Sequence, residues 1–223
     1  AADEDSTLAF EMLVDALGLG ATPPVLQQRI ETAPPRGALN PQSIAYALAA
    51  ALPDHAILVD ESLTTGRETM GYTMGAQPHD LINNMGGSIG YGTPVATGAA
   101  LACPDRRTVC MVGDGSAMYT IQSLWTQARE GLPVTTIIFA NNQYAILKAE
   151  YANMGAGTPG PQAMAMIDID RPTIDWVAMA KSMGVPGVQV DSAEGLYQAM
   201  VRSAQEPGPS LIEVKLYYCL LYT

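Results

Sequence analysis

TVCMVGDGS (residues 108–116) and VTTIIFANN (residues 134–142) are the two stretches that decide the fold. Each begins with a short uncharged run rich in β-branched residues, which is typical of a strand buried on both faces of a parallel sheet. The residues between them, 119–130, predict a helix. Because ligands bind beyond the carboxyl ends of the strands in open α/β sheets, we expect Asp114 and Asn142 to meet at a binding edge.

The alternation of strand-like and helix-like patterns continues on both sides of these two stretches. Asn40 and Pro41 suit the N-cap and first turn of a helix. Strands alternating with helices predict an α/β fold, a doubly wound and mostly parallel sheet with helices on both faces. Further strands are predicted at residues 57–60, 80–83 and 210–215, and helices at residues 8–19, 41–51, 67–72, 95–101, 173–183 and 193–205.

The side chains at the two strand ends suit a hard metal ion and a phosphate. Asp114 and Asn142 offer oxygen ligands, which Mg2+ or Ca2+ prefers and zinc does not. Gly113 and Gly115 would let the backbone approach a phosphate closely, and Ser116 would lie near a helix start. The alternative is a tight strand-to-helix turn followed by an Asn-rich loop. The two motifs together favour a metal-bridged diphosphate.

The spacing of the two motifs resembles a known signature. GDG, the 25 residues from Ser116 to Ala140, and NN resemble the thiamine diphosphate motif. Residues 39–216 are similar to the C-terminal, pyrophosphate-binding domain of the acetohydroxyacid synthase, pyruvate oxidase and benzoylformate decarboxylase group. The resemblance implies thiamine diphosphate and Mg2+ as cofactors. It also implies a 2-oxo acid substrate, which is decarboxylated or condensed as in acetolactate synthase.

The resemblance assigns metal ligands and diphosphate contacts to the two motifs. It implies that Asp114, Asn142 and the backbone carbonyl of Tyr144 bind Mg2+. Contacts to the cofactor are implied for Gly113, Gly115, Ser116, Asn142, Tyr144 and Ala145, the last two through backbone N–H groups.

Two further segments carry implied cofactor contacts. In the Gly-rich loop NMGGSIGYG (residues 84–92), Gly87 would accept a hydrogen bond from the pyrimidine ring and Ile89 would support the bent cofactor. In the turn after the strand at residues 57–60, Thr64 would contact the diphosphate, and Leu63 would do so through its backbone. Alternatively, Ile89 is an ordinary core residue and Thr64 a solvated hydroxyl. This turn lacks the Gln-His pair that is usual in acetohydroxyacid synthases. Its absence favours a decarboxylase.

No catalytic residue is assigned within this chain. The resemblance implies that an activating glutamate comes from a pyrimidine-binding domain of the same or another chain, and that the enzyme is a homodimer or tetramer. Glu61 matches the diphosphate-side turn, so it is not assigned that role. We expect residues 1–38 to be a remnant of a preceding domain and a linker, residues 39–216 the cofactor domain, and residues 217–223 an unassigned tail. Alone, the chain is expected to be inactive, as a fragment or as one of two subunits. The alternative is a non-catalytic binding or interaction module.

Composition limits the other classes of function. The net charge of −11 argues against nucleic-acid binding, and no uncharged run is long enough to span a membrane. No signal peptide is visible, and the three cysteines have no metal-ligand spacing, so we expect a cytoplasmic protein. Neither His55 nor His79 is expected to act as an acid or base.

The segment at residues 151–169 has no clear periodic pattern. It is rich in Gly, Pro, Ala and Met, and it includes Met154, Met164 and Met166. Its length predicts a mobile lid with an adaptable apolar wall, or alternatively plain packing against a neighbour.

Overall fold

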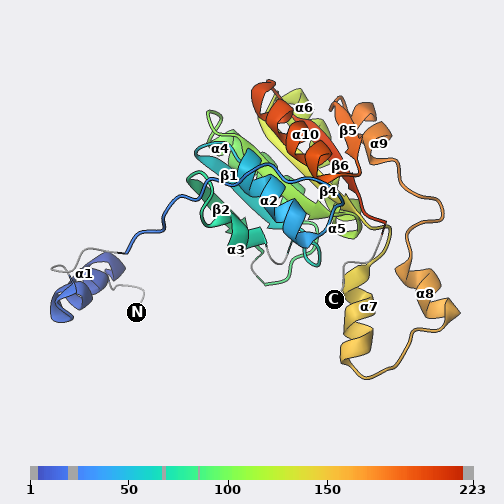
Figure 1. Ribbon diagram of the computed structural model, residues 1–223, viewed down its shortest axis with the longest axis horizontal. Coiled ribbons are helices and arrows are strands. Elements are labelled where there is room, and N and C mark those ends of the chain that lie inside the picture. The colour runs from blue at the N-terminus through green and yellow to red at the C-terminus, as the bar shows by residue number, and fades with distance from the viewer. Residues whose placement is uncertain (1–4, 20–24, 67–68, 85, 218–223) are drawn as a thin grey trace.

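The computed structural model describes residues 5–19, 25–66, 69–84 and 86–217. Its centre is a six-stranded parallel sheet in the order β2-β1-β3-β4-β6-β5. The strands are β1 (Ala56–Glu61), β2 (His79–Asn83), β3 (Thr108–Gly113), β4 (Val134–Ala140), β5 (Gly187–Val190) and β6 (Ser210–Lys215). The chain leaves β1 toward β2 and then returns past β1 to β3, so the strand order reverses beside β1 (Figure 1). Such a reversal opens a crevice at the carboxyl ends of the strands.

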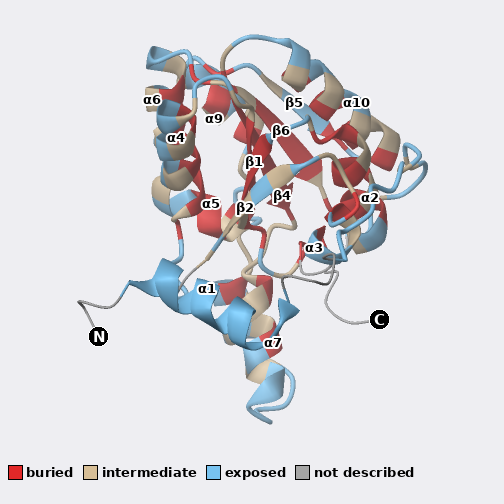
Figure 2. Cartoon of the chain, turned by 90° about the vertical axis from the view of Figure 1, so that its left-hand side faces the viewer, coloured by how far each residue is buried: buried red, intermediate tan, exposed pale blue. Residues whose placement is uncertain are grey.

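Helices cover both faces of the sheet, which confirms the predicted doubly wound α/β fold. On one face, α2 (Pro41–Ala51) and α10 (Ala193–Gln205) pack on alternate strand residues such as Met111 and Ile137. On the other face, the residues in between, such as Cys110 and Ile138, contact α4 (Gly92–Ala102), α5 (Asp114–Thr120), α6 (Ser123–Arg129) and α9 (Trp176–Ser182). Figure 2 shows the buried residues concentrated on the sheet and the inner sides of these helices.

The start of α2 is fixed by the residues that its sequence predicts. The Asn40 side chain accepts the backbone N–H of Ser43 at 2.8 Å, and the Ser43 hydroxyl accepts the backbone N–H of Asn40 at 2.9 Å. With Pro41 in the first turn, this reciprocal pair forms a capping box. The predicted N-cap is therefore confirmed.

The single helix predicted at residues 119–130 is wrong. The structure has two helices there, α5 and α6, separated by Ile121 and Gln122. The backbone carbonyl of Thr120 accepts hydrogen bonds from the Thr93 hydroxyl at 3.0 Å and the Ser123 hydroxyl at 2.9 Å. These hydroxyl groups compete for a carbonyl that would otherwise continue the helical ladder.

Residues 151–169, which show no clear periodic pattern in the sequence, form helices over part of their length. Helix α7 (Ala145–Asn153) extends into this segment, and α8 (Pro161–Ile167) follows after glycines with positive φ. Pro161 explains the start of α8, because its fixed φ suits the first helical turn. The short strand β5 is not predicted from the sequence at all.

The N-terminal helix α1 (Ser6–Ala16) contributes no buried residue and stands away from the sheet in Figure 1. Helix α3 (Thr69–Thr73) corresponds to the helix predicted at residues 67–72, whose first two residues lie outside the described range. Most of the predicted tail, residues 218–223, also lies outside it. None of the described helices combines the length and apolar character that a membrane span requires.

Candidate functional site

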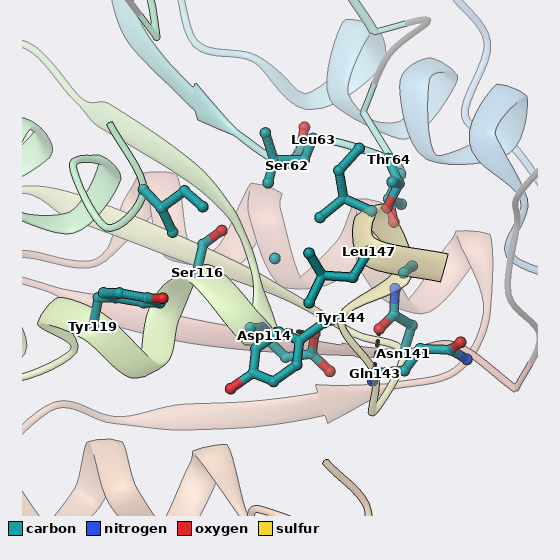
Figure 3. A pocket seen from close by; sticks show the side chains of 16 residues that line it. Ser62, Leu63, Thr64, Asp114, Ser116, Tyr119, Asn141, Gln143, Tyr144 and Leu147 are labelled. Atoms are coloured by element: carbon teal, nitrogen blue, oxygen red, sulfur yellow. Dashed lines mark hydrogen bonds between the residues drawn. The ribbon is translucent and has the colours of Figure 1, made fainter. Parts of the chain in front are cut away.

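A cavity of about 270 Å3 lies at the carboxyl edge of the sheet, where the turn after β1 and the ends of β3 and β4 converge (Figure 3). Most of the sequence-predicted site residues line it, namely Leu63, Thr64, Ile89, Gly113, Asp114, Gly115, Ser116, Tyr144 and Ala145. Asn142 contacts Asp114 directly, whereas Gly87 is exposed and is not a lining residue. The parallel sheet therefore brings together four segments that are far apart in the sequence.

Asp114 is the charged residue of this cavity and is only 2% exposed. One carboxylate oxygen accepts the backbone N–H of Asn142 at 2.6 Å, and the other accepts the backbone N–H of Gly115 at 2.8 Å. Burial raises the pKa of Asp114 to about 6, against the opposite effect of these N–H donors. Among the described residues that line the cavity there is no Lys, Arg or His. The carboxylate therefore faces a space where a cation would be favoured.

Asn142 adopts a left-handed conformation with φ of +57°, which directs its N–H to Asp114. Asn tolerates this region better than most residues do. Leu63, at φ of +47°, has no such tolerance. Backbone conformations of this kind persist where the surrounding structure enforces them, and they concentrate at functional sites.

The loop after β4 is also held from its other side. The Tyr144 N–H donates to the carbonyl of Ile167 at 2.9 Å, and the Ile169 N–H donates to the carbonyl of Asn142 at 2.9 Å. The Ala145 N–H donates to the Gln143 carbonyl at 2.9 Å. The two N–H groups implied as diphosphate donors, those of Tyr144 and Ala145, are thus already used within the chain. The end of α8 supports the loop, although Met154, Met164 and Met166 do not line the cavity.

Gly115 lies close to the Tyr144 ring at the cavity wall. Figure 3 shows Tyr144 beside Asp114 there. A Cβ atom at position 115 would be 2.6 Å from Cδ1 of the Tyr144 ring, so any larger residue would displace the ring. Ser116, one residue further, is buried beside this contact. A side chain at position 115 therefore requires the Tyr144 ring to move.

The remaining wall is mostly apolar. Ile89 lines the cavity while 50% of its surface is exposed, so it is not an ordinary core residue. Thr64 lines the cavity rather than lying in open solvent. Sequence reasoning missed part of the lining, namely Ser62, Thr65, Tyr119, Asn141, Gln143, Ile146 and Leu147. A signal for several of these was available, since they adjoin the two motifs in the sequence.

Comparison with known proteins identifies the family. The model of the C-terminal TPP binding domain of thiamine pyrophosphate enzymes matches residues 64–214. A Mycobacterium tuberculosis protein named as an acetolactate synthase large subunit is 46% identical over 207 residues, covering 92% of this chain and 40% of that protein. Benzoylformate decarboxylase of Pseudomonas aeruginosa is 30% identical over 212 residues, covering 94% of this chain and 39% of that protein.

Solved structures agree with the sequence relatives. The thiamine diphosphate-dependent 4-hydroxybenzoylformate decarboxylase of Rhodococcus jostii RHA1 has a TM-score of 0.69 at 31% identity, over 86% of this chain and 35% of that chain. The chain thus spans about two fifths or less of the length of these relatives. From the convergent cavity, the family match and these relatives, we conclude that the chain belongs to the thiamine pyrophosphate enzymes, through their C-terminal cofactor-binding domain.

Proposed function

We propose that this chain binds thiamine diphosphate together with Mg2+ in the cavity at the ends of β1, β3 and β4. The observation that carries the proposal is the buried Asp114 carboxylate, which faces a cavity lined by no cationic side chain among the described residues. A divalent ion would supply the missing positive charge.

The donor set fits Mg2+ bound jointly with a diphosphate. Asp114, the Asn142 amide and the Tyr144 carbonyl offer hard oxygen atoms, although the Tyr144 carbonyl also accepts the Leu147 N–H at 2.9 Å. Within the described ranges, no three His, Cys, Asp or Glu side chains gather into a metal site. Mg2+ commonly takes one or two carboxylates and completes its shell with phosphate oxygens and water, so one carboxylate suffices here.

A further polar atom beside the site fits this proposal. In the described part of the chain, Oε1 of the cavity-lining Gln143 is buried without a hydrogen-bond partner. A buried acceptor without a donor costs free energy. Water bound to a metal ion is a donor of the kind that this atom lacks.

We propose that the bound cofactor serves the decarboxylation of a 2-oxo acid, the step that decarboxylases and acetolactate synthases share. When bound, thiamine diphosphate supplies a carbon nucleophile and takes up the electrons left by carbon dioxide. This chain would bind the diphosphate through the hydroxyl groups of Ser116 and Thr64, and Gly113 and Gly115 would let the backbone approach it closely. The apolar side chain of Ile89 would support the ring side and help to exclude water, and Leu63 would contact the diphosphate through its backbone.

The proposal places the other half of the site on a second domain. A pyrimidine-binding domain, in the same or another chain, would complete the site and supply the activating glutamate. The assembly that we propose is a homodimer or tetramer. Within residues 1–223 we assign binding and positioning roles only.

Calorimetric titration tests the proposed cofactor site. Thiamine diphosphate should bind in the presence of Mg2+ and not in the presence of a chelator. Asp114→Ala should weaken binding by about 2–5 kcal/mol, as expected for the loss of one partner of a buried charge pair. The control Asp54→Ala removes an equal charge from an exposed turn before β1 and should leave binding unchanged.

Two outcomes would contradict the site. One is binding that does not require Mg2+, and the other is equal affinity of the wild type and Asp114→Ala. An assay of carbon dioxide release from pyruvate and benzoylformate, made on the assembly with its pyrimidine-binding domain, tests the activity separately. Binding without any such release would favour the non-catalytic module.

A further inference from the structure

Glu61, the last residue of β1, is a buried carboxylate that the proposed cofactor site does not use. It is 1% exposed and does not line the cavity. In the described part of the chain it forms no ion pair with Lys or Arg. A buried carboxylate without a cation is costly unless hydrogen bonds compensate it, so its donors indicate its role.

The donors to Glu61 all belong to the Gly-rich loop at residues 84–92, whose last residue, Gly92, begins α4. One carboxylate oxygen accepts the backbone N–H of Gly90, and the other accepts the backbone N–H of Gly92 at 2.6 Å. Burial raises the pKa of the Glu61 carboxyl, while these N–H donors act in the opposite direction. The side chain thus links the end of β1 to two alternate residues of the loop.

The same loop is bonded from two more directions. The Thr120 hydroxyl, at the end of α5, donates to the Gly90 carbonyl at 2.6 Å. The Tyr91 hydroxyl donates to the carbonyl of Asp60. Gly90 itself has φ of +87°, and a Cβ there would be 2.5 Å from Cβ of Tyr119, so the loop passes close to α5. These contacts fix the backbone on one side of Ile89.

The bonds to Gly90 hold the backbone next to Ile89 in place. The Ile89 side chain lines the cavity and is half exposed, so its own packing does little to hold it. Its peptide neighbour Gly90 is the residue that Glu61 and Thr120 bind. The direction of the Ile89 side chain therefore depends on contacts made outside the cavity.

We propose that Glu61 is a positioning residue that holds the loop at residues 88–92 so that Ile89 stays in place against the ring side of the cofactor. This inference rests on the proposed function, because it requires the cavity to bind thiamine diphosphate. Glu61 does not touch the cofactor. It follows that binding of the rings depends on Glu61, whereas binding of the diphosphate through Ser116 and through the Mg2+ at Asp114 does not.

Two probes separate these contributions in calorimetric titrations with Mg2+. Thiamine diphosphate engages both sides of the cavity, and inorganic diphosphate engages only the anion side. Glu61→Gln should weaken thiamine diphosphate binding tenfold or more and change inorganic diphosphate binding less than threefold. Asp114→Ala should weaken both.

Glu213→Gln is the matched control for burying an amide in place of a carboxylate. Glu213 lies on β6, is 4% exposed, and accepts a hydrogen bond from Gln189 at 3.1 Å, away from the loop. Its variant should leave both affinities unchanged. Amide hydrogen exchange should be faster at Gly90 and Gly92 in Glu61→Gln and not in Glu213→Gln.

If Glu61→Gln fails to fold, Thr120→Val tests the same loop by removing its other side-chain bond to Gly90. It should show the same selective loss, smaller in size. The inference would be overturned if the folded loop variant bound thiamine diphosphate as tightly as Glu213→Gln does. It would also be overturned if the loop variant lost affinity for thiamine diphosphate and for inorganic diphosphate to the same extent. Wild-type protein that binds neither probe in a Mg2+-dependent manner would instead refute the proposed function.

Discussion

Asp114 shows how one side chain can be costly for folding and suited to binding. Its carboxylate is buried at the end of β3, with only backbone N–H donors in contact. Those donors orient the carboxylate but do not remove the cost of its charge, which is why burial raises its pKa to about 6. The free energy lost by burying this charge in the metal-free chain would be recovered when a divalent ion binds, which favours the affinity that we propose.

This cost predicts a pH dependence of the metal-free chain. Because the pKa of Asp114 rises from 3.8 to about 6 on folding, the folded chain holds a proton over a range where the unfolded chain has released it. The free energy of unfolding, relative to that of Asp114→Asn, should therefore fall as the pH rises from about 4 to about 6, by on the order of 3 kcal/mol. Urea denaturation of both proteins in a chelator measures this difference. A difference that does not vary with pH, or that grows with pH, would contradict the assignment.

The contact between Gly115 and Tyr144 predicts the effect of one added methyl group. In Gly115→Ala the new Cβ would meet the Tyr144 ring at 2.6 Å and displace it, so thiamine diphosphate binding should weaken tenfold or more. Gly98→Ala, in α4, is the control, because a Cβ there meets nothing within 4 Å. It should leave binding unchanged and raise stability by about 0.5–1 kcal/mol, since Ala is the better helix former. Recovery of affinity in the double variant Gly115→Ala/Tyr144→Ala would identify the ring as the cause, and no recovery would exclude it.

Helices α1 and α2 have similar N-caps but differ in burial, because α2 packs against the sheet and α1 does not. Asp5 caps α1 by accepting the N–H groups of Thr7 and Leu8, much as Asn40 caps α2. Helix α2 buries Ile44 and Leu48 against the sheet, whereas α1 buries nothing. The contribution of a helix cap to global stability depends on whether its helix is part of the cooperative unit.

This pair predicts different outcomes for the same kind of substitution. Asn40→Ala should lower the free energy of unfolding by about 1 kcal/mol, because it removes a cap from a helix that packs in the core. Asp5→Ala should leave the global unfolding transition unchanged, because α1 is not packed on the core. Urea titrations followed by tryptophan fluorescence compare the two. Equal losses in both variants would show that α1 unfolds together with the core.

Of the six strands of the sheet, β1, β2, β3, β4 and β6 are predicted within one residue of their observed bounds. Strands β1, β3, β4 and β6 are mostly buried, and their continuous apolar runs mark them in the sequence. The edge strand β2 is only partly buried and is nevertheless predicted, at residues 80–83. The short strand β5 has exposed Val188 and Gln189, so no such run marks it. The break between α5 and α6 depends on Thr93, whose hydroxyl reaches Thr120 from a distant part of the chain. Contacts of that kind leave no local pattern.

The same limit applies to the candidate site. The meeting of Asp114 with Asn142 follows from the rule that parallel strands share a carboxyl edge, and the structure brings them into contact. The left-handed conformation of Leu63 could not be predicted, because Leu disfavours it and only the surrounding turn imposes it. The bond from Glu61 to Gly92 spans 31 residues and is likewise visible only in the fold.

For the whole molecule, stability should be independent of its N-terminal helix. None of the described residues 5–19 is buried, and the first backbone contact of the following segment with the sheet region is from Ile30 to Gly75 at 2.7 Å. Deleting residues 1–24 should therefore leave the midpoint of urea unfolding unchanged. A lower midpoint in the shortened chain would reveal a stabilising contact of α1, and deletion to residue 36, which removes the Ile30 contact, should lower it.

The parallel sheet also governs when the cavity can exist. Parallel neighbours in this sheet are connected through crossovers. Strand β4 pairs with β6, so Thr135 can pair with Ser210 only after the long stretch of chain between them has closed into a loop. Closing such a loop costs conformational entropy before the strand pairing contributes any stabilisation. Folds with many long-range strand pairings therefore form slowly. We therefore expect the four segments around Asp114 to come together only once the sheet has formed, so that a ligand has no site to bind before then. Occupancy of the cavity would lengthen the lifetime of the finished protein without hastening its formation.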